Sequence, residues 1–71
     1  MAINDRLYEM LKTQAQSEKA KALLTLELLN TKAVGVGEHS TKDFYENAED
    51  ALMMLVDAND KLKTIESLYK K

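Results

Sequence analysis

Hydrophobic residues recur along the chain at alternating spacings of three and four, and this spacing predicts α-helix rather than strand. The clearest series lies in the second half: Phe44, Ala48, Ala51, Leu55, Ala58, Leu62, Ile65 and Tyr69. A matching series lies in the first half: Leu7, Leu11, Ala15, Ala22, Leu26, Leu29 and Ala33. Polar Glu18 and Lys19 interrupt that first series, so its centre is the weak point of the predicted packing. The pattern predicts an all-α protein with two long amphipathic helices.

A single break separates the two predicted helices. The chain has no proline, and its two glycines, Gly35 and Gly37, lie near its middle. We therefore predict one domain over residues 1–71, with a helix over about 4–33, a loop over about 34–40 and a helix over about 41–70. Asn4 is a suitable N-cap for the first helix, and Ile3 is placed to pack on Tyr8. A loop this short folds the helices back as an antiparallel hairpin.

The predicted hairpin has more apolar surface than it can cover. Seventy-one residues without a cysteine form a small core with no disulfide to support it. Two segments, 22–29 (ALLTLELL) and 51–56 (ALMMLV), are apolar on more than one face, and antiparallel pairing places them close together. We predict that a second hairpin covers them, giving a dimer of hairpins, that is, a four-helix bundle or coiled-coil-like homo-oligomer. Its interface is predicted at Leu24, Leu28, Leu52 and Val56.

Two other interpretations of this apolar surface stay open. A long, curved single hairpin could leave some leucines exposed, although two helices alone offset the conformational entropy of folding poorly. Alternatively, a different protein binds through the same residues. We expect an unidentified protein partner in addition to self-association.

Charge and hydropathy bear on the class of partner. The formal net charge is -2, and the lysines of the first helix are interleaved with carboxylates, so we expect no nucleic-acid partner and no binding to anionic membranes. No apolar run approaches the roughly 20 residues that span a bilayer. The first residues also lack the basic start and apolar core of a signal peptide, and a cytoplasmic location is the expectation.

Candidate chemistry is confined to one group of carboxylates. Asp43, Glu46 and Asp50 share one side of the second helix and are candidates for holding a divalent cation. The alternative is that they remain solvated near a helix N-terminus, whose dipole they complement. Glu46, Glu49 and Asp50 resemble the carboxylate helix of the all-α nucleotide pyrophosphohydrolases, a resemblance that implies magnesium and a triphosphate held inside a helical bundle. Those enzymes need a second acidic cluster on a facing helix, where this chain offers only isolated Glu18 and Glu27.

Apart from those carboxylates, the sequence contains no nucleophile–base pair, no glycine-rich phosphate loop and no metal-ligand spacing, so we expect no enzymatic activity and no cofactor. The predicted loop, with Gly35, Gly37, Glu38 and the sole histidine, His39, is a candidate partner-binding segment. We expect a small non-catalytic protein–protein interaction or regulatory module, of a kind typical of phage and mobile-element accessory proteins. The competing interpretation is a metal-dependent helical-bundle enzyme that uses the acidic face of the second helix.

Overall fold

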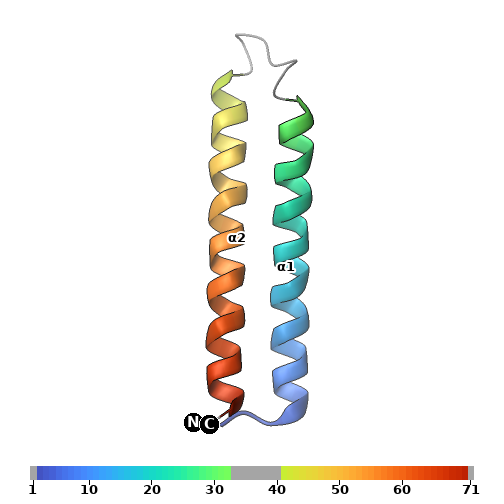
Figure 1. The fold of residues 1–71 in the computed structure, drawn as a ribbon, viewed down its shortest axis with the longest axis vertical. Helices are drawn as coiled ribbons and strands as arrows, with labels where there is room; N and C mark the ends of the chain where they lie inside the picture. Colours follow the sequence, from blue (N-terminus) through green and yellow to red (C-terminus); the bar gives the residue numbers. More distant parts are fainter. Residues whose placement is uncertain (1, 33–40, 71) are drawn as a thin grey trace.

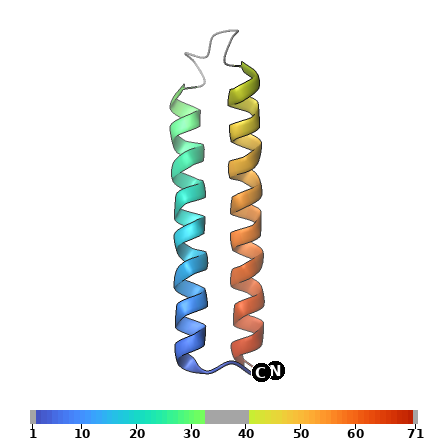
Figure 2. The ribbon, with the colours of Figure 1, turned by 180° about the vertical axis from the view of Figure 1, so that it is seen from behind.

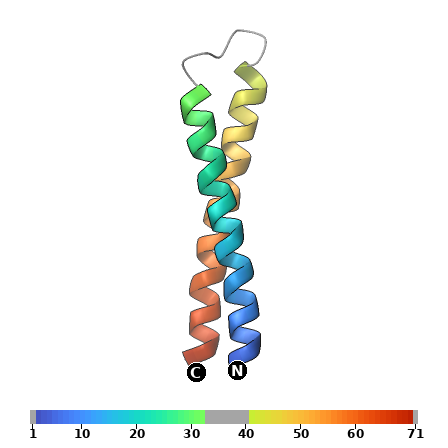
Figure 3. The same cartoon turned by 90° about the vertical axis from the view of Figure 1, so that its right-hand side faces the viewer.

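Two helices make up almost all of the described chain. The computed structural model describes residues 2–32 and 41–70, of which 95% are helical and none lies in a strand. Helix α1 spans Asp5–Lys32 and helix α2 spans Thr41–Lys70. They lie side by side and run in opposite directions (Figures 1 and 2), and they cross at a shallow angle (Figure 3). The predicted two-helix hairpin is therefore confirmed.

The start of α1 follows the predicted capping. The Asn4 side-chain oxygen accepts a 2.8 Å hydrogen bond from the Leu7 backbone N–H, and the Asn4 carbonyl accepts one from the Tyr8 N–H at 2.9 Å. This arrangement satisfies donors that have no partner inside the first turn. Ile3 packs against the cluster that contains Tyr8, as predicted. Together these contacts fix the direction in which the chain enters α1.

The contact between the helices repeats every seven residues and is built mainly from alanine. The buried side chains are Tyr8, Ala15 and Ala22 on α1, and Ala51, Ala58 and Ile65 on α2. A seven-residue repeat keeps one narrow stripe of each helix on its partner, and alanine lets the two backbones approach closely. Because alanine has a single side-chain carbon, this seam buries little apolar surface of its own.

The predicted stripe of α1 needs one correction. Leu7 is 39% exposed, and Tyr8 occupies the seam position that we assigned to Leu7. Tyr8 lies seven residues before Ala15, so it continues the spacing of the buried alanines, and its ring stacks on Tyr69 of α2. On α2 the stripe is as predicted except for Tyr69, which remains partly exposed despite that stack.

Glu18, which interrupts the apolar stripe of α1, forms an ion pair with α2. Both carboxylate oxygens of Glu18 accept hydrogen bonds from Lys61 Nζ, at 3.2 and 3.1 Å. The two side chains are 33% and 54% exposed, so solvent screens the pair and its net contribution is at most about 1 kcal/mol. The centre of the hairpin is therefore joined across the helices, but weakly.

The hairpin is too elongated to enclose a core. Its extents are 51 × 14 × 12 Å and its radius of gyration is 16.0 Å, whereas a compact domain of this length has about 11 Å. A rod two helices wide leaves most of each helix surface facing solvent (Figure 1). Any large apolar side chain outside the seam is consequently uncovered.

Candidate functional site

Large apolar side chains are exposed mainly in the half of the hairpin near the connection between the helices. We call this the loop-proximal half: residues 21–32 of α1 and 41–56 of α2. Among the described residues, eight exposed large apolar side chains lie there: Leu23, Leu24, Leu28, Tyr45, Leu52, Met53, Met54 and Val56. Scattered exposed leucines are normal, but a concentration of this size is typical of an interaction surface.

The four residues predicted at an oligomer interface are all uncovered in the hairpin. Leu24, Leu28, Leu52 and Val56 are each between 49% and 56% exposed. The structure therefore leaves them available for a partner, as the sequence suggests, while their contact with a second copy remains a prediction.

These four residues lie on two different faces. Successive residues of an α-helix are about 100° apart, so Leu24 lies about 200° beyond buried Ala22, on the side of α1 away from α2. Leu28 lies close to the same direction. On α2, Leu52 directly follows buried Ala51 and lies about 100° away, on a lateral face. The outer face of α1 and the lateral face of α2 are thus two separate apolar surfaces.

A cluster of aromatic and charged side chains joins the helices at the opposite end. The Tyr8 and Tyr69 rings stack with centroids 3.9 Å apart, at an interplanar angle of 17°. The Tyr8 hydroxyl donates to Glu66 Oε1, and the Tyr69 hydroxyl donates to Asp5 Oδ1 at 2.6 Å. Lys12 Nζ lies 5.2 Å from the centre of the Tyr8 ring, within the range of a cation–π contact. We call these residues the tyrosine cluster.

Neighbouring charges change the acidity of the tyrosine cluster. The hydrogen bond to the Glu66 carboxylate, reinforced by partial burial, raises the pKa of Tyr8. The hydrogen bond to Asp5 likewise raises the pKa of Tyr69, because a nearby carboxylate disfavours the negatively charged phenolate. The Tyr8 oxygen raises the pKa of Lys12. Tyr8, Tyr69 and Lys12 therefore keep their protons at neutral pH, and their contacts join the two helices at this end.

Sequence reasoning placed Tyr69 on its stripe but missed this cluster. The signal was present: residues 8 and 69 are nearly equidistant from a loop centred near Gly37, so a hairpin brings them together. Carboxylates then occur within reach of both hydroxyls. The pairing of each tyrosine with one particular carboxylate depends on side-chain direction, which spacing alone does not specify.

The carboxylates proposed for a cation do not gather into a site. Asp43, Glu46 and Asp50 are exposed on α2. Within residues 2–32 and 41–70, no group of three histidine, cysteine, aspartate or glutamate side chains is arranged to hold a metal ion. The second acidic cluster that the pyrophosphohydrolase resemblance requires does not face them from the described part of α1, where Glu18 binds Lys61 instead.

Several hollows, all open to solvent, lie on the surface of the described residues. One of about 280 Å³ is lined by Glu18, Asp50, Met53, Met54, Asp57 and Lys61, and two more involve the seam and α1. One, of about 460 Å³, runs along the seam below the Glu18–Lys61 pair and is lined by Leu11, Gln14, Ala15, Glu18, Asp57, Asp60, Lys61, Thr64 and Ile65. The other, of about 730 Å³, lies on α1 and is lined by Glu9, Met10, Thr13, Gln14, Ser17, Glu18 and Lys21. Neither lining contains a nucleophile paired with a base, so these hollows are shapes into which a neighbour can pack, not catalytic pockets.

The predicted partner-binding residues Gly35, Gly37, Glu38 and His39 lie outside the described residues, and their role remains a prediction. Over the part of the chain that the structure describes, neither helix has a stretch long and apolar enough to cross a bilayer. No family model, curated protein or solved structure matches the chain.

Proposed function

We propose that this chain is a small non-catalytic protein-interaction module that works by packing the exposed apolar faces of its helices against another polypeptide, beginning with a second copy of itself. One observation carries the proposal. The seam between the helices is built largely from alanine, while larger apolar side chains, such as Leu24 and Leu52, point elsewhere and are about half exposed. Although Leu11, Leu55 and Leu62 are partly buried beside the alanines, a large apolar surface is left that the hairpin does not cover.

The energy available on these faces is large for so small a chain. Full burial of a leucine or valine side chain contributes about 1.5–3 kcal/mol, so covering four that are already half buried contributes about 3–6 kcal/mol. A complete small domain is stable by only about 5–15 kcal/mol. Association through Leu24, Leu28, Leu52 and Val56 would therefore be a major part of the stability, and folding and association should be coupled.

The competing proposal, a metal-dependent enzyme, has less support. It requires carboxylates such as Asp43 and Glu46 to converge with others on one cation, and the described side chains offer no such convergence. Solvated carboxylates in the first turns of α2 are accounted for by the helix dipole alone.

Thermal unfolding followed by circular dichroism tests the proposal. Because a second copy binds the folded chain and not the unfolded one, the melting temperature should rise steadily from low-micromolar to several hundred micromolar protein. Magnesium or manganese at millimolar concentration should leave the melting temperature unchanged. A melting temperature that is independent of protein concentration would contradict self-association, and a clear rise with either metal would favour the enzyme instead.

A further inference from the structure

A second regular series of side chains follows the outer face of α1, opposite the seam. It consists of Met10, Thr13, Ser17, Ala20, Leu24, Leu28 and Thr31, all exposed, and we call it the outer stripe. Its members recur at spacings of three and four, as in a packed coiled-coil face, and none is ionisable. The Thr31 hydroxyl donates to the Leu28 carbonyl at 2.8 Å, so its polarity is already satisfied within the helix. Figure 3 looks onto this face of α1, which no other part of the described chain covers.

The two ends of the outer stripe have complementary shapes. At one end Leu24 and Leu28 project from the helix, 56% and 52% exposed. Towards the other end the hollow of about 730 Å³ lies where Thr13 and Ser17 have small side chains. Four residues of its lining, Met10, Thr13, Gln14 and Ser17, stand at positions i, i+3, i+4 and i+7. That is the arrangement of four residues that receives one side chain in knobs-into-holes packing.

From this complementarity we infer that a second copy of the chain docks antiparallel on the outer stripe of α1, with Leu24 of each copy inserted into the hollow at Thr13 of the other. The inference rests on the self-association proposed above and assigns Leu24 and Leu28 to its contact, whereas Leu52 and Val56, on the lateral face of α2, lie outside this contact. A two-fold axis near the middle of the stripe brings each projecting end onto the opposite hollow, so both copies make the same contact and the assembly closes as a dimer. The small residues Ser17 and Ala20 then face each other near the axis, where the two backbones come closest.

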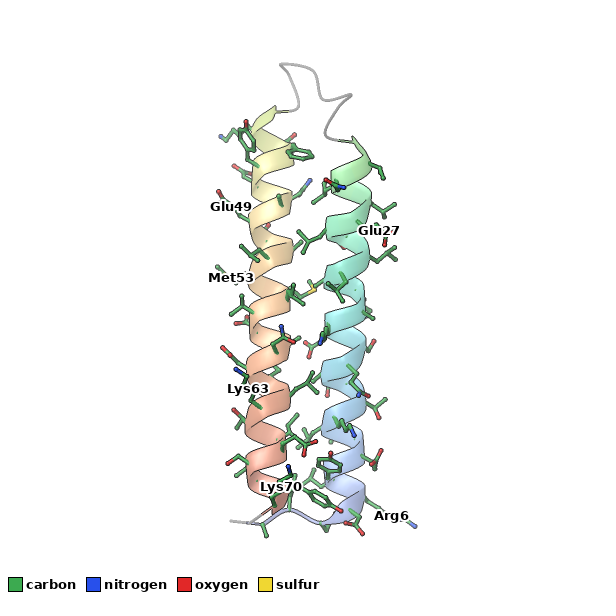
Figure 4. The ribbon with its side chains drawn as sticks, viewed as in Figure 1. Arg6, Glu27, Glu49, Met53, Lys63 and Lys70 are labelled. Carbon is green, nitrogen blue, oxygen red and sulfur yellow. The ribbon has the colours of Figure 1, made fainter. Side chains whose placement is uncertain are left out.

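The outer face of α2 could not serve the same purpose. Its exposed residues include Glu46, Glu49, Asp57 and Asp60 around Met53. Figure 4 shows Glu49 and Met53 pointing away from α1. A two-fold contact there would place carboxylates of one copy against carboxylates of the other, and facing like charges are destabilising. The outer face of α1 carries fewer carboxylates: Figure 4 shows Glu27 pointing away from α2, beside the outer stripe, but the centre of the stripe is uncharged.

Cysteine cross-linking tests the geometry cleanly because the chain has no cysteine of its own. The Thr13→Cys and Leu24→Cys variants are mixed in equal amounts at several hundred micromolar and equilibrated in a glutathione redox buffer. We expect the Thr13–Leu24 disulfide to be the main product, about tenfold above the product of a matched control mixture of Thr13→Cys with Met53→Cys, because only closely facing positions satisfy disulfide geometry. Met10→Cys mixed with Leu28→Cys is a second pair that should also link.

The outcomes separate this geometry from self-association in general. If the wild-type chain sediments as a dimer but neither pair links above the control, the docking geometry is wrong and the proposed self-association stands. If Leu24→Cys alone forms the main disulfide, the copies are parallel and the inference is overturned. If the wild-type chain sediments as a monomer at the same concentration, the inference and the proposed self-association both fail. Circular dichroism of each variant before mixing shows that its helices are intact.

Discussion

The two halves of this hairpin hold their helices together by different means. At the open end, where the first turns of α1 meet the last turns of α2, Tyr8 and Tyr69 stack and each donates a hydrogen bond to a carboxylate. Among the described residues, every hydrogen bond between side chains of the two helices lies at this end or at Glu18–Lys61 near the centre. In the loop-proximal half the fully buried residues are alanines, Leu26, Leu29 and Leu55 are only partly buried, and most of the other large apolar side chains are exposed. The open end is held by contacts between the helices, whereas the loop-proximal half has most of the exposed large apolar side chains among the described residues.

The largest expected effect on association comes from a charge placed in the loop-proximal half. Leu28→Glu should weaken dimer formation at least thirtyfold, about 2 kcal/mol, because the dimer would then bury an unpaired carboxylate. Sedimentation equilibrium measures the dissociation constant. Lys63→Glu is the matched control, since Lys63 is exposed on α2 and points away from α1 (Figure 4). Equal behaviour of the two variants would remove the distinction between the halves.

A substitution at the open end should lower stability without preventing association. Tyr8→Ala removes a 7% exposed ring together with its stack and hydrogen bond, and we expect a loss of about 3 kcal/mol. Urea unfolding at fixed protein concentration measures the free energy of unfolding. The variant should still dimerise at several hundred micromolar. A Tyr8→Ala chain that remains fully helical but is monomeric at that concentration would show that the open end takes part in the interface.

Alkaline pH should act mainly on the open end. The folded chain raises the pKa of Tyr8 and Tyr69 above the unfolded value of about 10, so the folded state holds these protons more tightly. The resulting stability is complete below about pH 10 and is lost as the pH rises through the raised pKa values. The double variant Tyr8→Phe, Tyr69→Phe should lose less stability over that range. It also removes the hydroxyl that raises the pKa of Lys12. The free energy of unfolding of the wild-type chain and of the double variant is measured at a series of pH values. If it changes with pH identically in both proteins, this explanation is contradicted.

The smallest effect is expected where the two halves meet. Glu18→Gln breaks the ion pair with Lys61, which is partly exposed, and should cost at most about 1 kcal/mol. The cost should shrink with added salt, because salt screens exposed charges. Thermal melting of both proteins at low and at high salt measures this difference. A larger loss that salt does not change would show that Glu18 contributes through packing in the seam rather than through its charge.

The periodicity of apolar residues and the single break at the two glycines predicted the hairpin, and the periodicity predicted most of its seam. The spacing of Ala51, Ala58 and Ile65 identified the buried face of α2, and Asn4 marked where α1 begins. It failed at Leu7, because Leu7 and Tyr8 are adjacent and both suit a stripe of this spacing. Only the stack with Tyr69 on the other helix decides between them. A contact between residues distant in the chain is not encoded in local spacing.

The sequence predicted which segments carry the exposed apolar side chains, but not on which faces of the hairpin they lie. The sequence showed that residues 22–29 and 51–56 carry more apolar side chains than one neighbour covers, and these side chains are indeed exposed. It placed Leu24 and Leu52 in one patch, whereas their positions relative to the alanine seam separate them onto two faces. The residues that lie on the seam determine the direction in which every other side chain of the helix points. At the start of α1 the seam residue is Tyr8, one position after the Leu7 that we expected.

Sedimentation equilibrium of the wild-type chain tests most directly whether a second copy buries the exposed apolar side chains of the loop-proximal half. Between low-micromolar and several hundred micromolar protein, the account predicts a weight-average mass that rises from near the 8.0 kDa of one chain to twice that value and then stays constant. A mass that remains that of one chain at every concentration, or one that keeps increasing beyond the dimer, would contradict it.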